Sequence, residues 1–282
     1  MNSKLLAHHG LKWNPFAPEV PIEALLATPE IKNFCWRVAH LTPQGGFALV
    51  TGDPGLGKSV ALRLLVEKLM TQGDLTIGVL TRPQTGLQDF YRELGDLFGV
   101  QLSPNNRWGG TRLLRQRWQA HIEGTLLRPV LIVDEAQEMQ PAVLNELRLL
   151  CAADLDSRCL LTVVLAGDLR MAEKFRAQEL LPLGSRIRVR AVLEPATPTR
   201  LVECLHHSLT QAGNAQLMTK DLMTTLAEHA AGNYRILMTM AGELLDAAVQ
   251  RELKQLDEKL YLEVFAVPAT PQRRGTRASI AR

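Results

Sequence analysis

Cysteine is scarce in this sequence, and its spacing excludes two classes of protein. The chain has 4 cysteines among 282 residues: Cys35, Cys151, Cys159 and Cys204. None belongs to a C-x-x-C pair, and no histidine stands at metal-ligand spacing from them. A disulfide-stapled secreted scaffold and a zinc module of regular spacing are therefore excluded. We expect reduced, buried thiols in a cytoplasmic protein.

Long apolar runs are also absent. No uninterrupted apolar stretch approaches the roughly 18 residues that a helix needs to cross a bilayer. The start, MNSKLLAHHGLKW, has no apolar segment followed by small residues, so no signal peptide is visible. The hydrophobic fraction of 46% and the charged fraction of 22% exclude a largely disordered protein, a collagen and a coiled-coil rod. We expect no membrane partner.

Charge is nearly balanced in total and uneven along the chain. The 32 basic and 29 acidic residues leave a net charge of +3. Residues 107–128 carry 5 arginines and 1 glutamate, and residues 267–282 carry 4 arginines and no acid. The chain is thus a mildly acidic body with two basic segments, which are the candidates for contact with an anionic partner.

The apolar pattern predicts an α/β fold in which strands alternate with helices. Five short apolar segments predict buried strands: Phe47–Thr51, Leu75–Thr81, Val130–Asp134, Leu161–Gly167 and Ile187–Val192. Helical spacing of apolar residues marks the segments between them: Val60–Met70, Leu87–Leu97, Leu113–Ile122 and Pro141–Leu150. This alternation predicts a parallel sheet sandwiched by helices.

After Pro195 the pattern becomes purely helical. Helices are expected over Thr199–Gln211, Asp221–Ala231, Arg235–Leu253 and Asp257–Phe265. We therefore predict four parts of the chain. They are an N-terminal segment (1–35) that packs near the nucleotide discussed below, an α/β core (36–195), a small all-helical lid (196–265) and a basic, disordered tail (266–282).

A glycine-rich loop follows the first predicted strand. Gly52-Asp53-Pro54-Gly55-Leu56-Gly57-Lys58-Ser59 matches the phosphate-loop pattern G-x-x-x-x-G-K-[ST]. Glycines let the backbone turn its N–H groups toward phosphate oxygens, and the helix that follows adds its positive end. We expect the loop and Val60 to bind the nucleotide, with Lys58 on the β- and γ-phosphates and Ser59 on Mg²⁺.

Two carboxylates stand at the end of a later strand. Asp134 and Glu135 follow the apolar run Val130–Val133, and ligands of open α/β sheets bind at the carboxyl ends of strands. Asp134 is the candidate to hold Mg²⁺ through water. Glu135 is the candidate base that orients the attacking water. The phosphate loop and this acidic pair together favour ATP hydrolysis over nucleotide binding alone.

These motifs resemble those of AAA+ ATPases in content and order. A later strand ends in Leu165-Ala166-Gly167-Asp168, and the motifs Gly184-Ser185-Arg186-Ile187 and Gly232-Asn233-Tyr234-Arg235 follow. Trp13-Asn14-Pro15-Phe16, together with Val-Asp-Glu-Ala-Gln, is similar to a narrower branch. That branch contains general secretion pathway A-type ATPases and the transposition target-selection ATPases of the TnsC, TniB and Mu B type.

The resemblance implies further site residues. Asn14 and Phe16 would lie near the adenine, and Asp168 occupies the sensor position, where a carboxylate would repel γ-phosphate unless a cation or proton intervenes. Arg186 would be the arginine finger that reaches a neighbouring subunit. Arg235 would be the lid arginine of the same chain. Arg188 and Arg190 alternate with Arg186, as charges on a solvated strand edge do.

The basic segment has two interpretations. In one, Arg107–Thr111 is a flexible turn before a helix, and Arg112 and Arg115 share the exposed face of that helix. The relatives that encircle duplex DNA turn such loops toward it, which implies DNA contacts by Arg82, Gln88, Arg107, Thr111, Arg112 and Arg115. In the other, the segment is only a solvated basic face.

The sequence leaves three functions open. The first is an ATP-dependent protein that oligomerises on duplex DNA as a ring or filament, is recognised by a transposase, and is dismantled by hydrolysis. The second is a secretion-pathway ATPase, and the third is a nucleotide-switched adaptor without DNA binding. The expected cofactors are ATP and Mg²⁺.

Overall fold

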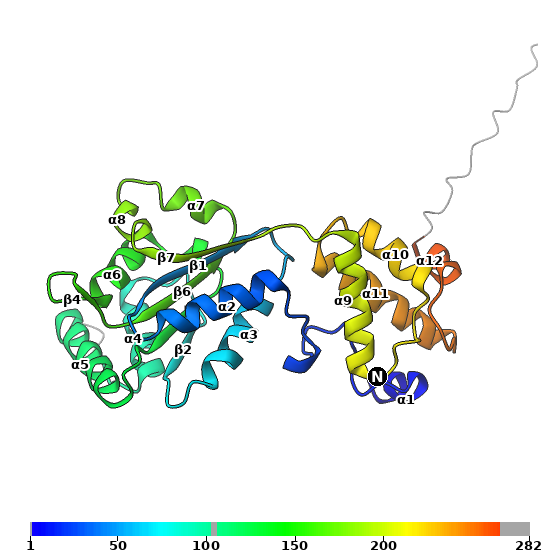
Figure 1. Cartoon of the computed structure of the whole chain (residues 1–282), viewed down its shortest axis with the longest axis horizontal. Coiled ribbons are helices and arrows are strands. Elements are labelled where there is room, and N and C mark those ends of the chain that lie inside the picture. The colour runs from blue at the N-terminus through cyan, green and yellow to red at the C-terminus, as the bar shows by residue number, and fades with distance from the viewer. Residues whose placement is uncertain (1, 103–105, 266–282) are drawn as a thin grey trace, which may run out of the picture.

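A five-stranded parallel sheet forms the centre of the larger lobe of the protein (Figure 1). The structure is a computed structural model, and it describes residues 2–102 and 106–265. The strands lie in the order β2-β3-β6-β1-β7. Their bounds are Gly46–Gly52 (β1), Ile77–Leu80 (β2), Val130–Val133 (β3), Thr162–Gly167 (β6) and Ile187–Leu193 (β7). Every neighbouring pair is parallel, so the carboxyl ends of all five strands meet at one edge.

Helices cover both faces of the sheet, and strand alternation decides which side chain meets which face. Phe47 and Leu49 of β1 belong to the hydrophobic cluster of α4 (Leu87–Phe98), α5 (Arg107–Thr125) and α6 (Pro141–Cys151). Ala48 and Val50 belong to the cluster of α2 (Pro29–Leu41) and α3 (Lys58–Met70). Successive side chains of a strand point to opposite faces, so a fully apolar strand fits between two helical layers.

Short elements connect these layers at the rim. A 3-10 turn, η2 (Ala136–Glu138), follows β3, and a small antiparallel hairpin of β4 (Ala152–Ala153) and β5 (Arg158–Cys159) follows α6. Two short helices, α7 (Arg170–Lys174) and α8 (Leu181–Gly184), lead into the edge strand β7.

The smaller lobe is helical and holds a hydrophobic cluster of its own (Figure 1). It consists of α9 (Pro198–Ala212), α10 (Lys220–His229), α11 (Tyr234–Gln250) and α12 (Glu258–Phe265). Three of these helices begin at a side-chain cap, namely Thr197, Thr219 and Asn233, whose oxygen atoms accept backbone N–H groups of the first turn.

The N-terminal segment joins the two lobes. Helix α1 (Asn2–His9) packs beside α11 in the smaller lobe, and Leu11 and Phe16 are buried in its cluster. The chain then passes through η1 (Ile22–Ala24) to α2, whose first turn is capped by Thr28.

The expected fold class is confirmed: a helix-covered parallel sheet is followed by a helical region. One local prediction is wrong. Arg107–Thr111 is not a flexible turn but the first turns of α5, because the Asn106 side chain accepts the N–H of Gly109 at 2.8 Å and caps the helix there. The boundaries of the four parts stay predictions, and the basic tail lies outside the described residues. No described helix combines the length and the apolar character needed to span a bilayer.

Candidate nucleotide site

The phosphate loop curls between β1 and α3 through two glycines in left-handed conformations. Gly55 has φ +87° and Gly57 has φ +97°, values that residues with a Cβ rarely adopt. A Cβ on Gly57 would meet no atom within 4 Å, so the loop borders open space at that point. Helix α3 begins at Lys58 and directs its free N–H groups toward this space.

Lys58 is held inside the curve of the loop. Its side chain is buried, and its ammonium donates to the carbonyl oxygens of Gly52 at 2.9 Å and Asp53 at 3.1 Å. Both acceptors belong to the loop itself. The cation therefore lies where the phosphate chain of a nucleotide in this loop would pass.

Ser59 and Asp134 meet across the carboxyl edge of the sheet, although they are 75 positions apart in the sequence. The Ser59 hydroxyl donates to Oδ2 of Asp134 at 2.9 Å. A hydroxyl and a carboxylate are hard oxygen ligands, and Mg²⁺ characteristically takes one or two protein ligands beside phosphate oxygens and water. The residues present thus fit the expected ion.

Glu135 is placed by its backbone and by a neighbouring amide. It adopts φ +52°, unusual for a residue with a side chain, and its N–H donates to Oδ1 of Asp134 at 2.9 Å. The Gln137 amide nitrogen donates to Oε2 of Glu135 at 2.5 Å. The Gln137 amide oxygen, Oε1, accepts the backbone N–H of Asp168 at 3.2 Å. Gln137 therefore ties the candidate base to the end of β6.

Asp168 has a cationic partner of its own. Its carboxylate accepts the backbone N–H of Arg170 at 2.9 Å and the Arg170 guanidinium at 2.7 Å. Arg170 also reaches Glu138 at 3.2 Å, and its pKa is raised by the hydrogen bond to Asp168. The resemblance called for a cation beside this carboxylate, and Arg170 supplies one within the chain.

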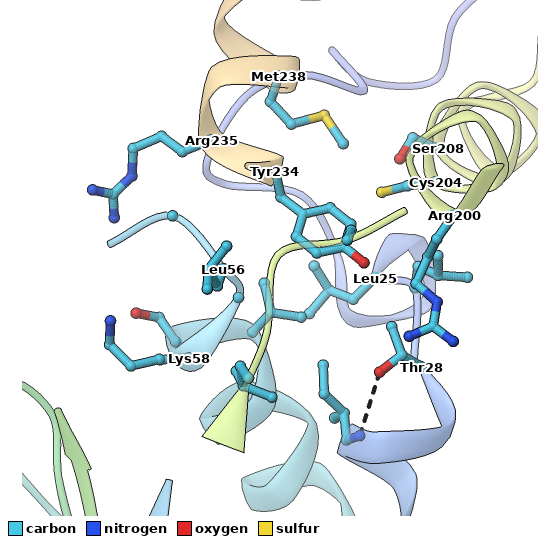
Figure 2. A pocket seen from close by; sticks show the side chains of 18 of the residues that line it. Leu25, Thr28, Leu56, Lys58, Arg200, Cys204, Ser208, Tyr234, Arg235 and Met238 are labelled. Atoms are coloured by element: carbon cyan, nitrogen blue, oxygen red, sulfur yellow. Dashed lines mark hydrogen bonds between the residues drawn. The ribbon is translucent and has the colours of Figure 1, made fainter. Parts of the chain in front are cut away.

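A cavity of about 900 Å³ opens between the phosphate loop and the helical lobe. Its wall includes apolar side chains from the N-terminal segment, the end of β7 and the helical lobe: Phe16, Leu25, Ile31, Val192, Tyr234 and Met238. In Figure 2 the Tyr234 ring points from α11 toward Leu25, and Lys58 and Arg235 lie on the other side of Leu56. Its size and mixed lining suit a nucleotide, with the base among apolar groups and the phosphates on the loop.

The far wall of this cavity carries an ion pair and a half-buried phenol. Arg200 of α9 pairs with Glu30 of α2 at 2.9 Å, which links the two lobes. Burial raises the pKa of Tyr234 to about 12, so its hydroxyl is protonated at neutral pH. The sequence alone singled out neither Arg200 nor Glu30, and it gave Tyr234 only as part of a motif.

The helical lobe is docked on the phosphate loop through one asparagine. The Asn233 amide donates to the Pro54 carbonyl at 2.9 Å while its oxygen caps α11, and the N–H of Arg235 donates to Gly55 at 3.3 Å. A Cβ on Gly55 would lie 2.2 Å from the Asn233 side chain. Arg235 lines the cavity directly beside the loop.

The two residues expected at the adenine differ in position. Phe16 lines the cavity, whereas Asn14 is not among the lining residues and instead accepts the Phe16 N–H at 3.0 Å. Asn14 thus shapes the turn that presents Phe16.

Arg186 lies at the opposite edge of the sheet. It directly precedes β7, whose amino end pairs with Phe47 and whose carboxyl end pairs with Gly52 at the phosphate loop. A strand of this length separates the two edges by about 20 Å. Arg186 forms an ion pair with Asp156, donating from Nε at 3.3 Å. It therefore does not reach the nucleotide site of its own chain.

The six candidate DNA contacts divide into two groups. Arg107 pairs with the buried carboxylate of Glu146, and Thr111 bonds Tyr91 at 2.7 Å. Arg115 donates to a backbone carbonyl of β4. The side chains of these three residues thus have partners within the protein.

The other three, Arg82, Gln88 and Arg112, are exposed, and within the described residues their side chains make no hydrogen bond. Tyr91 of α4 contacts Gly110 and Thr111 of α5, so the starts of both helices lie side by side.

The loop, the acidic pair two strands away and the docked helical lobe define an AAA+ P-loop protein. Residues 42–175 match the AAA domain family. General secretion pathway protein A of Aeromonas hydrophila is 31% identical over 211 residues, which are 73% of this chain and 38% of that protein. ATP-dependent target DNA activator B of Escherichia phage Mu is 30% identical over 180 residues, 62% of this chain and 53% of that protein.

These matches confirm the family resemblance. Residues 42–175 carry an AAA domain, and the chain has relatives in both groups that its motifs indicated. It spans about half or less of the length of these relatives.

Solved structures agree on the fold. Cdc6p from Pyrobaculum aerophilum superposes with a TM-score of 0.67 at 16% identity and covers 90% of this chain and 71% of that one. Drosophila ORC bound to DNA superposes with a TM-score of 0.63 at 18% identity, and the match covers 94% of this chain and 66% of that one.

Proposed function

We propose that this chain is an ATP-dependent DNA-binding ATPase that oligomerises on duplex DNA and regulates transposition, with hydrolysis driving disassembly. The observation that carries the ATPase is the meeting of Ser59, Asp134 and Glu135 at the carboxyl edge of the sheet, beside Lys58. Binding of nucleotide alone needs no carboxylate in the place of Glu135, whereas hydrolysis needs a group that orients water.

Each residue has a separate task in hydrolysis. The N–H groups of the loop and Lys58 bind the phosphates, and Ser59 and Asp134 hold Mg²⁺, which when bound neutralises phosphate charge. Glu135 orients and polarises the water that attacks the γ-phosphate, and Gln137 keeps the Glu135 carboxylate in place. Arg235 binds the γ-phosphate from the lobe that closes the cavity.

Arg186 acts on the nucleotide of a second copy. Its position at the amino edge, about 20 Å from its own phosphate loop, supports action in trans. A guanidinium supplied by a neighbour makes hydrolysis depend on assembly. We therefore propose a ring or filament in which each nucleotide site lies at a subunit interface.

DNA binding is supported by the exposed side chains of Arg82, Gln88 and Arg112. Guanidinium groups that are not used inside the protein are available to phosphate oxygens. The phage Mu relative, whose name describes an ATP-dependent target DNA activator, supports the same role. The proposed partner that recognises the assembly is a transposase or another transposition protein.

A secretion-type function is the second candidate, because general secretion pathway protein A matches a larger share of this chain than the phage protein does. In that case the protein would couple ATP to a protein partner. Intact ATPase activity without any DNA affinity would favour it, or a nucleotide-switched adaptor, over the first proposal.

The test is the affinity of the purified protein for labelled duplex DNA, measured by fluorescence anisotropy with ATP, with a slowly hydrolysed analogue, with ADP and without nucleotide. We expect the protein to bind DNA with ATP and with the analogue. Lys58→Ala is expected to abolish this DNA binding. Lys68→Ala, an exposed lysine further along the same helix, is the matched control. Equal binding in all four nucleotide states would contradict the proposal.

A further inference from the structure

Two of the four cysteines lie together at the β4–β5 hairpin. Cys151 is the last residue of α6, and Cys159 is the last residue of β5. Cys159 pairs across the hairpin with Ala152, the residue next to Cys151, and the Leu160 N–H donates to the Cys151 carbonyl at 2.9 Å. With roughly 5 Å between paired residues and about 3.4 Å between neighbours along a strand, the two Cα atoms are about 6 Å apart. Disulfide bonds join cysteines at such a separation.

Both cysteine side chains border the same cavity. This cavity, of about 470 Å³, lies at the amino edge of the sheet and is lined by Cys151 and Cys159 together with Arg128 and Arg188. Cys151 is buried, whereas Cys159 is half-buried, and its Sγ donates to the Leu161 carbonyl at 3.1 Å. A small solute can therefore reach Cys159 through the cavity, while Cys151 is shielded from bulk water.

The two thiols differ in how readily they lose a proton. A hydrogen bond from Cys151, helped by the charges of Arg188 and Arg128, outweighs burial and lowers the pKa of Cys159 to about 7. Burial raises the pKa of Cys151 well above its usual range. The thiolate is the nucleophilic form of cysteine, and nearby guanidinium groups favour it at neutral pH. Cys159 is therefore the reactive thiol of the pair, and Cys151 is the protonated neighbour beside it.

The other two cysteines lack this environment. Cys35 is buried in the hydrophobic cluster of α2 and α3, and burial raises its pKa to about 11. Cys204 is buried on α9, and burial raises its pKa to about 12. Both are protonated at neutral pH, so they provide unreactive thiols within the same molecule for comparison.

We propose that Cys151 and Cys159 form a peroxide-reactive dithiol site, in which Cys159 is oxidised first and Cys151 then closes a disulfide bond with it. A low-pKa, accessible thiol beside a second thiol is the arrangement that converts peroxide oxidation into a reversible disulfide. The bond joins the end of α6 to β5 and fixes the hairpin between them. Neither step involves nucleotide or DNA, so the site goes beyond the proposed function.

The oxidation proceeds in two steps. The Cys159 thiolate attacks one oxygen of hydrogen peroxide: an S–O bond forms, the O–O bond breaks, and the departing hydroxide takes up the proton that Cys159 released. The Cys151 sulfur then attacks the sulfur of this sulfenic acid: the S–S bond forms, the S–O bond breaks, and the departing hydroxide leaves as water with the Cys151 proton. The two thiols are oxidised to a disulfide, and the peroxide is reduced to water.

Peptide mapping of the purified full chain tests this site directly. The protein is treated with hydrogen peroxide, its remaining thiols are blocked with N-ethylmaleimide, and it is digested with trypsin for mass spectrometry. Cleavage after Arg148, Arg158 and Arg170 places Cys151 in peptide 149–158 and Cys159 in peptide 159–170. We expect these two peptides to be joined, the free thiols to fall from 4 to 2, and dithiothreitol to restore all 4.

Substitutions separate the roles of the two thiols. In Cys151→Ala, peroxide should leave Cys159 as a sulfenic acid that dimedone traps, and no linked peptides should form. In Cys159→Ala, Cys151 should stay reduced because it is buried and protonated. Cys35→Ala is the matched control and should form the linked peptides as the wild type does. In the untreated protein, Cys159 should react with N-ethylmaleimide about a hundredfold faster than Cys35 or more, because far more of it is thiolate.

Three results would overturn the proposal: all 4 thiols still reduced after peroxide, oxidation of Cys35 as fast as that of Cys159, or a disulfide that joins two copies of the chain on a non-reducing gel. The mapping of the wild-type chain needs no substitution, so it decides the question even if Cys151→Ala lowers stability. It also reads neither ATPase activity nor DNA binding, so failure of the proposed function would be seen separately.

Discussion

At the scale of single residues, hydrolysis in the proposed function depends on Glu135. Its carboxylate borders the cavity and is held by Gln137 at 2.5 Å. Glu135→Gln is expected to keep ATP binding and to lower the turnover number about a hundredfold or more, because the base is lost. Steady-state phosphate release and filter binding of ATP measure the two effects. Glu138→Gln, a nearby carboxylate, serves as control, and unchanged turnover in Glu135→Gln would remove Glu135 from this role.

Glu146 is a second carboxylate whose loss should have a measurable effect, in this case on the stability of the fold. It is buried, accepts the Tyr91 hydroxyl at 2.5 Å and pairs with Arg107. Glu146→Ala removes the ion-pair partner of Arg107 and one of the two hydrogen-bond partners of Tyr91, so the free energy of unfolding should fall by about 1 to 3 kcal/mol. Urea denaturation measures it, with the exposed Glu173→Ala as control. A loss no larger than the control's would show that the network contributes little.

The motif residues were predictable because a short pattern specifies their chemistry. Lys58, Ser59, Asp134 and Glu135 stand at one edge, as the strand ends required. Gln137 acts through contacts across the fold. Asn233 was only one letter of a motif until its bond to Pro54 was visible. Roles of this kind depend on which loops meet, and local sequence does not contain that information.

At the scale of elements, α5 decides which basic side chains are free. The helix begins at Arg107, and its first turns pack Gly110 against Tyr91. Arg107 is consequently paired with Glu146 and Arg115 with a backbone carbonyl, whereas the exposed Arg112 side chain has no such partner within the described residues. The basic face is therefore narrower than the charge count of the segment suggests.

This division predicts different outcomes for two arginine variants. Arg112→Ala should weaken duplex-DNA binding and reduce the slope of log affinity against log salt by about one, because one phosphate contact is lost. Arg107→Ala should mainly lower the free energy of unfolding. DNA titrations at several salt concentrations and urea denaturation separate the two, with the ion-paired Arg251→Ala as control. A salt slope that Arg112→Ala leaves unchanged would argue against this edge as the DNA contact.

The sequence predicted helices and strands correctly where the apolar residues recur with a strong period. It failed where a capping residue decides where a helix begins. All five main strands and the helices from α9 to α12 were expected near their observed positions. Helix α2 was missed, although Thr28-Pro29 and the spacing of Ile31, Phe34 and Cys35 carry the signal of a capped amphipathic helix. The β4–β5 hairpin has only 2 residues per strand, too few to produce a period.

At the scale of the whole molecule, the nucleotide cavity and Arg186 lie at opposite edges of one sheet. A head-to-tail contact between copies brings these unlike surfaces together, and such contacts repeat into rings or filaments. In the proposed function, neither the carboxyl edge nor the amino edge of the sheet alone provides a complete site for ATP hydrolysis. Activity is thus expected to be a property of the assembly.

Complementation between variants follows from this arrangement. Lys58→Ala copies retain the arginine edge, and Arg186→Ala copies retain the phosphate loop. Each alone should be nearly inactive, while an equal mixture should regain about one quarter of the wild-type ATPase rate if copies associate at random through a heterologous interface. A mixture as inactive as its components would place Arg186 outside the site.

The most direct test of the account is negative-stain microscopy of the purified full chain with ADP, with ATP and with a slowly hydrolysed analogue, each with and without duplex DNA. The account predicts rings or filaments with ATP or the analogue, more numerous on DNA, and none for Lys58→Ala. Monomers under every condition, from protein that binds ATP, would contradict it.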